Sequence, residues 1–99
     1  MSMKQDFEQR MQAKLEECEI CIKRLKEKAN RSETAIRAEC CKLIDDLSMK
    51  ERSARENLDQ MRQTGEEDWD LIYSPAANIY DALAESVEKA LDWAASKFN

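Results

Sequence analysis

The chain has 99 residues and a net charge of −5, and 37% of its residues are charged while 6% are aromatic. It has no histidine and a single glycine, which excludes a Ser-His or Cys-His nucleophile pair and a glycine-rich phosphate loop. An enzyme is therefore not expected, and a chain this short fits one domain, residues 1–99.

Apolar residues recur every three or four positions from Met3 to Phe98. This spacing is the period of an α-helix with one buried face, and alternating steps of three and four are typical of helices packed along a seam. The sequence therefore predicts an all-α fold of the coiled-coil type.

The first helix has two possible extents. The apolar stripe passes through Leu25, Ala29, Ser32 and Ile36 without losing phase, which favours one long helix over about residues 3–63. The alternative is a turn near residues 30–32, because Asn30 is followed three residues later by a glutamate in a capping pattern. Such a turn would make a three-helix bundle.

A turn at residues 64–65 separates this helix from the next. Thr64 is followed by Gly65 and, three positions on, by Glu67, which is the pattern of a capping box. The returning helix is expected over about residues 66–98, antiparallel to the first and kinked at Pro75. The favoured fold is thus an antiparallel coiled-coil helical hairpin.

In that hairpin the returning helix covers only part of the long one. The stripe from Met3 to Ala29 would then need a second chain, and we expect a homo-oligomer, with an antiparallel dimer favoured. The predicted interface residues are Phe7, Met11, Leu15, Ile22, Leu25, Ile36, Leu43 and Leu47. Further packing is expected from Leu58, Trp69, Ile72, Ile79, Leu83, Val87 and Leu91.

Charge and hydropathy narrow the choice of partner. The basic cluster from Lys23 to Arg31 is interleaved with Glu27 and contains no aromatic residue, so nucleic acid is not expected. The helix from Pro75 to Phe98 has a mainly acidic polar face, which makes membrane binding unlikely. The chain has no membrane-spanning run and no signal-peptide pattern, so a cytoplasmic location is expected.

Four cysteines offer the clearest chemistry. Cys18 and Cys21 have CxxC spacing, and a chain reversal between Asn30 and Arg31 would place Cys21 opposite Cys40 and Cys18 opposite Leu43. Together Cys18, Cys21, Cys40 and Cys41 would make a thiolate site for Zn(II) or Cu(I). The other interpretation, which we favour, is that cysteine acts as a small hydrophobe in the seam, with no cofactor.

The segment Thr64–Leu71 and the Leu/Ala/Val-rich stretch from Tyr80 to Phe98 follow a charged, amphipathic N-terminal region. In these features the chain resembles small uncharacterised bacterial coiled-coil proteins, with amphipathic helices like those of phasins and apolipoproteins. The resemblance implies a helical fold and no particular function. We expect a self-associating structural or interaction module that binds its own copies or a protein partner, and the alternative is a metal-binding or metal-sensing helical bundle.

Overall fold

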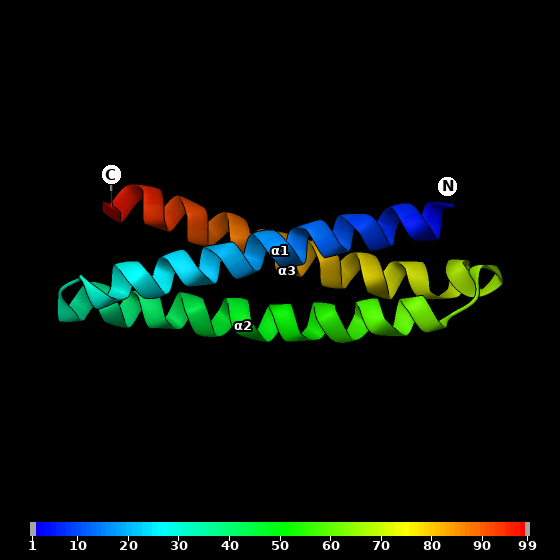
Figure 1. Cartoon of the computed structure of the whole chain (residues 1–99), viewed down its shortest axis with the longest axis horizontal. Helices are drawn as coiled ribbons and strands as arrows, with labels where there is room; N and C mark the ends of the chain where they lie inside the picture. Colours follow the sequence, from blue (N-terminus) through cyan, green and yellow to red (C-terminus); the bar gives the residue numbers. More distant parts are fainter. Residues whose placement is uncertain (1, 99) are drawn as a thin grey trace.

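Three long helices make up nearly all of the protein. The computed structural model describes residues 2–98, in which α1 spans Met3–Asn30, α2 spans Thr34–Gln63 and α3 spans Trp69–Phe98, with a short 3-10 turn, η1, over Glu66–Asp68. The helices α1 and α3 point the same way and α2 is antiparallel to both (Figure 1). They form an elongated bundle of 52 × 20 × 17 Å, and the chain enters at one end and leaves at the other. The expected all-α fold is confirmed.

The prediction of a single helix over residues 3–63 is wrong. The chain turns at residues 31–33 and forms the three-helix bundle, which was the alternative prediction. The turn contains neither glycine nor proline. It forms because the last carbonyl groups of α1 find other donors: the amides of Arg31 and Ser32 bond Lys28 and Ala29 at 3.1 and 3.2 Å. The Ser32 hydroxyl also donates to the Lys28 carbonyl at 2.6 Å. A helix can end where its terminal carbonyls are satisfied in this way.

Arg37, in the first turn of α2, ties the two helices together across this turn. Its Nε donates to the Ala29 carbonyl at 3.2 Å, and its Nη2 donates to the Ser32 carbonyl at 3.0 Å. One guanidinium therefore bonds both the end of α1 and the turn itself. Glu33, the residue that precedes α2, makes no side-chain cap bond, so the capping pattern expected at this turn does not form.

The second break lies where the sequence predicts it. The helix α2 ends at Gln63 and the next helical residue is Glu66. The predicted capping box is wrong, however, because the Thr64 hydroxyl donates back to the Gln60 carbonyl at 2.8 Å and no side chain caps η1. Pro75 lies inside α3, which continues on both sides of it. A capping box forms instead at Ser2, where the sequence analysis did not expect one.

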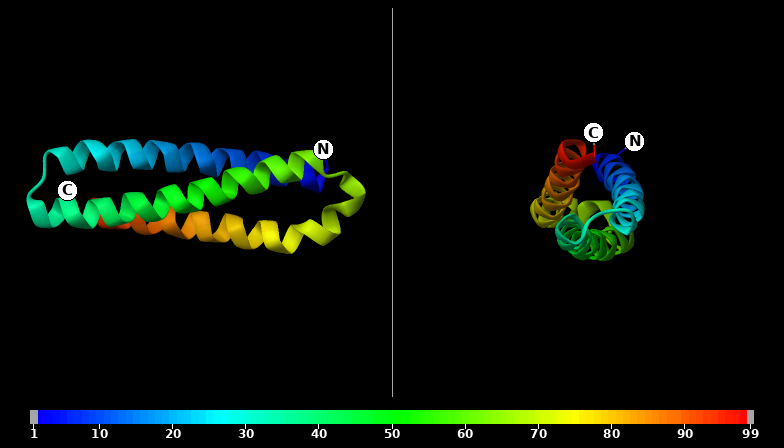
Figure 2. Two further views of the ribbon diagram at one scale, coloured as in Figure 1. Left: turned by 90° about the horizontal axis from the view of Figure 1, so that it is seen from below. Right: turned by 90° about the vertical axis from the view of Figure 1, so that its left-hand side faces the viewer.

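The apolar stripe forms the core of the bundle, and the other helices of the same chain cover it. Seen along its length, the bundle places the three helices around a common axis (Figure 2). The side chains of Phe7, Met11, Leu15, Ile22, Leu25 and Leu47 are buried, and Ile36 and Leu43 are half-buried. The stripe from Met11 to Ala29 is therefore not exposed for a second chain. The antiparallel dimer expected on that surface loses its basis, because the turn at 31–33 supplies the cover.

Aromatic side chains hold α1 against the N-terminal half of α3. The ring of Phe7 lies 5.5 Å from that of Trp69 and 5.8 Å from those of Tyr73 and Tyr80, measured between centroids. The rings are tilted or edge-to-face, which is the favourable geometry for aromatic pairs. Trp69 is buried, so the sequence-based interpretation of Trp69 as a core residue is confirmed.

We predict that Arg37→Ala lowers the free energy of unfolding by about 1–2 kcal/mol, because it removes two charge-assisted hydrogen bonds at a partly exposed turn. Urea denaturation followed by circular dichroism measures the change. Arg52→Ala is the matched control, since Arg52 is an exposed arginine on the same helix. Equal stability of the two variants would show that Arg37 does not hold the turn.

Candidate functional site

The four cysteines lie on α1 and α2 near the middle and the turn end of the bundle. Cys18, Cys21 and Cys40 are buried, and Cys41 is exposed. The Cys18 thiol donates to the Leu47 carbonyl at 3.7 Å, and the Cys40 thiol donates to the Leu25 carbonyl at 3.3 Å. The predicted partners were Leu43 for Cys18 and Cys21 for Cys40. The partner of each cysteine is thus displaced by four residues, about one helical turn, because the chain reverses at residues 31–33 and not between Asn30 and Arg31.

Burial keeps these thiols protonated. It raises the pKa of Cys18 to about 12, with a further contribution from the negative charge of Glu51. Burial also raises the pKa of Cys21 and of Cys40. Because the thiolate is both the nucleophile and the metal ligand, raised pKa values make these cysteines poor at both tasks at neutral pH.

The structure does not bring the predicted metal ligands together. Within residues 2–98 no group of three or more cysteine, aspartate or glutamate side chains is placed to hold a metal ion. Two of the four thiols bond main-chain carbonyls across the α1–α2 contact, and Cys41 points away from the core. Cys41 is exposed while the other three thiols are buried, and the buried cysteines fill core positions as small hydrophobes do.

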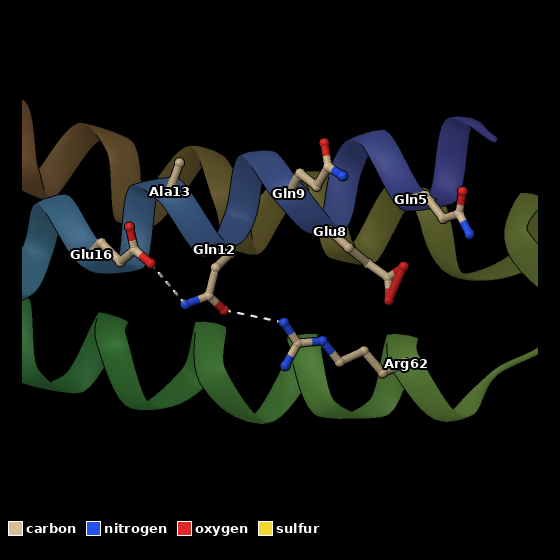
Figure 3. A pocket seen from close by; sticks show the side chains of 7 residues that line it. All are labelled: Gln5, Glu8, Gln9, Gln12, Ala13, Glu16 and Arg62. Carbon is tan, nitrogen blue, oxygen red and sulfur yellow. Dashed lines mark hydrogen bonds between the residues drawn. The ribbon is translucent and has the colours of Figure 1, made fainter. Parts of the chain in front are cut away.

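One shallow hollow on the surface is lined mainly by polar side chains. It has a volume of about 490 Å³ and lies on the outer side of α1 next to Arg62 of α2 (Figure 3). Arg62 donates to the Gln12 side chain at 3.2 Å, and Gln12 donates to Glu16 at 3.4 Å. Gln9 and Ala13 point away from α2 (Figure 3). Amide, carboxylate and guanidinium groups that bond one another in this way make a solvated helix surface.

A second feature runs along the contact between α1 and α3, which we call the α1–α3 seam. Three hollows lie in series along it. The first lies beside Phe7 and Tyr73, the second beside Lys14 and Ala84, and the third beside Cys21 and Phe98. The third, of about 270 Å³, reaches the buried side chain of Leu25. The seam is thus incompletely filled along its whole length.

Exposed apolar side chains gather on this seam. Six large hydrophobic residues of the described chain are exposed, and Met3, Tyr73 and Leu91 among them line its hollows. Leu91 was predicted to pack in the core, but 45% of it is exposed. Met3 belongs to the same apolar stripe as Phe7 and is 75% exposed. These two members of the predicted stripe are left uncovered, and both lie at the α1–α3 seam.

The helix α3 carries a second apolar stripe beside its core stripe. Its members follow one another at steps of three, four or seven, which places them on one side of the helix. They are Tyr73, Ala77, Tyr80, Ala84, Leu91, Ala95 and Phe98. The prediction of one buried face per helix does not include this stripe, although its spacing is visible in the sequence.

Charges of opposite sign border the seam. The basic edge consists of Arg10, Lys14, Arg24 and Lys28 of α1. The acidic edge consists of Glu88 and Asp92 of α3, which line the middle hollow, and of Asp81, which lies seven residues before Glu88 and so on the same side of the helix. Asp6 and Glu17 lie among the basic residues, and Glu17 pairs with Lys14 at 2.9 Å.

Comparison of the chain with protein-family models, with curated proteins and with solved structures finds no match. Among residues 2–98, none of the helices combines the length and the apolar character needed to cross a membrane.

We predict that Cys41 reacts with a thiol reagent at pH 8 at the rate of a free cysteine, while Cys18, Cys21 and Cys40 react at least about 100-fold more slowly. The difference follows from burial and from the raised pKa values of the three thiols. Absorbance with Ellman's reagent counts the fast and slow thiols, Cys41→Ser should abolish the fast phase, and denaturant should expose all four. Two or more fast thiols in the native protein would contradict this placement.

The pKa of Cys18 also predicts a pH dependence of stability. An unfolded thiol ionises near pH 8.5–9, whereas the folded Cys18 thiol ionises near 12. The folded state therefore holds the proton more tightly, and the free energy of unfolding falls as pH rises from about 9 toward 12. Compared with wild type, Cys18→Ala should show a shallower fall in urea titrations over this range. Equal slopes would show that Cys18 does not contribute.

Proposed function

We propose that the protein is a structural and interaction module that associates with its own copies through the α1–α3 seam, and that it catalyses no reaction. The observation that carries the proposal is the second apolar stripe of α3, which the rest of the chain leaves partly uncovered. A helix with so wide an apolar face is typical of a bundle in which a further helix packs against it.

The size of the seam supports this proposal. The bundle is 52 Å long, so a contact strip only about 15 Å wide along it would bury the roughly 800 Å² per partner that a stable interface needs. Tyr73 and Leu91, near opposite ends of the seam, are of the kind that fills a partner's pocket. The hollows of the seam in turn offer places for such side chains.

The chemistry of the remaining surface supports a non-catalytic role. The buried thiols are held protonated, and in the hollow beside Arg62 the polar side chains of Arg62, Gln12 and Glu16 bond one another. Since all four cysteines are free thiols, a reducing compartment suits the chain, and we propose a cytoplasmic location on this ground.

Self-association is tested by native mass spectrometry and by light scattering after size-exclusion chromatography, over protein concentrations from about 1 to 500 μM. We expect the wild-type chain to form oligomers in this range. Leu91→Glu should weaken the association at least about tenfold, because it places a charge in the middle of the apolar contact.

Met49→Glu is the matched control. Met49 is an equally large, exposed apolar residue, but it lies on α2 away from the seam. The substitution changes charge and hydropathy in the same way, and we expect it to leave association unchanged within about twofold. A wild-type chain that stays monomeric at all concentrations would refute the proposal, as would equal effects of the two variants.

A further inference from the structure

We propose that the partner on the α1–α3 seam is a second copy of this chain, related by a two-fold axis parallel to the helices. In this arrangement α1 of each copy lies beside α3 of the other, and the two run in the same direction. The inference rests on the proposed function and names the geometry of its interface.

The charges along the two borders of the seam favour this geometry. A face with a basic edge on α1 and an acidic edge on α3 can meet its own copy in two symmetric ways. With the axis parallel to the helices, the basic edge of each copy faces the acidic edge of the other. With the axis across the helices, α1 faces α1 and α3 faces α3, so that like charges meet. Like charges placed opposite one another oppose association.

The charges match in height as well as in sign. The Arg10 guanidinium lies over the ring of Tyr80, 5.3 Å from its centroid, so Arg10 is level with Asp81, the residue after Tyr80. Lys14, which pairs with Glu17, lines one hollow with Glu88 of the same chain. Rotation about an axis parallel to the helices leaves each residue at its own height. Arg10 therefore meets the partner's Asp81.

The same holds at the other end of the seam. Arg24 lines a hollow with Leu91 and Ala95 of α3, and Asp92 lies between these two residues in the sequence. Lys28 is fixed over the ring of Phe98, 5.4 Å from its centroid. The aromatic rings of α3 thus hold two cations of the basic edge in position before association. Ordered charges lose less conformational freedom on binding than free ones.

The apolar part of the contact fits the same arrangement. Leu91 protrudes from α3 between the second and third hollows, at the level of Cys21. In the parallel arrangement the Leu91 side chain of each copy faces the α1 side of the partner's seam. There the third hollow is lined by Cys21 and Leu25. The contact therefore buries two leucines in two apolar hollows.

The test exchanges the charges of the two edges. One variant carries Arg10→Glu and Arg24→Glu, a second carries Asp81→Lys and Asp92→Lys, and a third carries all four substitutions. All four residues are exposed and none of them packs in the core. Circular dichroism confirms that each variant keeps its helices, and analytical ultracentrifugation at 0.05 M salt measures the dimer dissociation constant.

We expect each two-residue variant to dimerise at least about tenfold more weakly than wild type, because each substituted residue then faces a partner residue of the same sign. The four-residue variant should return to within about threefold of wild type, since opposite signs face each other again. An equimolar mixture of the two weakened variants should form the mixed dimer, which native mass spectrometry identifies by its mass.

Two outcomes separate this geometry from the broader proposal. A wild-type dimer that Leu91→Glu weakens, but whose stability the edge exchanges do not change in this pattern, would overturn the two-fold geometry and leave self-association through the seam standing. A wild-type chain that is monomeric throughout would overturn both. Charge exchange on the far side of the bundle, Arg52→Glu with Glu56→Lys, is the control and should leave the dissociation constant unchanged.

Discussion

The fold depends on the hydrogen bonds that close the end of α1. A helix exposes four unpaired carbonyl groups at its C-terminus. Where no other donor is available, the amides of a further helical turn satisfy these carbonyl groups, so the helix continues. Here the amides of residues 31 and 32, the Ser32 hydroxyl and the Arg37 guanidinium supply these donors. This local arrangement ends α1 at Asn30 and sends the chain back along itself.

The rest of the architecture follows from that turn. Because α2 returns along α1, the stripe of α1 is covered within the chain and the cysteines lie opposite main-chain carbonyls of the neighbouring helix. The third helix then packs into the groove between the first two. Each helix buries one apolar stripe in the core. The helix α3 carries a second stripe, which stays partly exposed along the seam with α1.

Much of this fold could be predicted from the spacing of apolar residues. The helical period, the break after Gln63 and the burial of Leu15, Leu47 and Leu83 are all correct. The sequence favours a continuous helix over a turn at 31–33, because a three-residue turn preserves the phase of the apolar stripe. Its donors come partly from Arg37, six residues beyond Arg31, and no short pattern of sequence marks a guanidinium that reaches back to a helix end.

The candidate site was less predictable, for a related reason. The register of α1 against α2 depends on where the turn lies, and an error of a few residues there moves every predicted cysteine contact by one helical turn. The seam could have been found from the second stripe of α3. Which of the two stripes faces the core, however, is decided by packing against α1 and α2 and not by the stripe itself.

An odd number of helices gives the bundle a direction. The chain enters near one end and leaves near the other, so anything joined to its two ends is held toward opposite ends of the bundle. A two-fold axis parallel to the helices would keep this polarity in the pair, with both entry points at one end and both exit points at the other. The two ends of such a pair would therefore differ from each other.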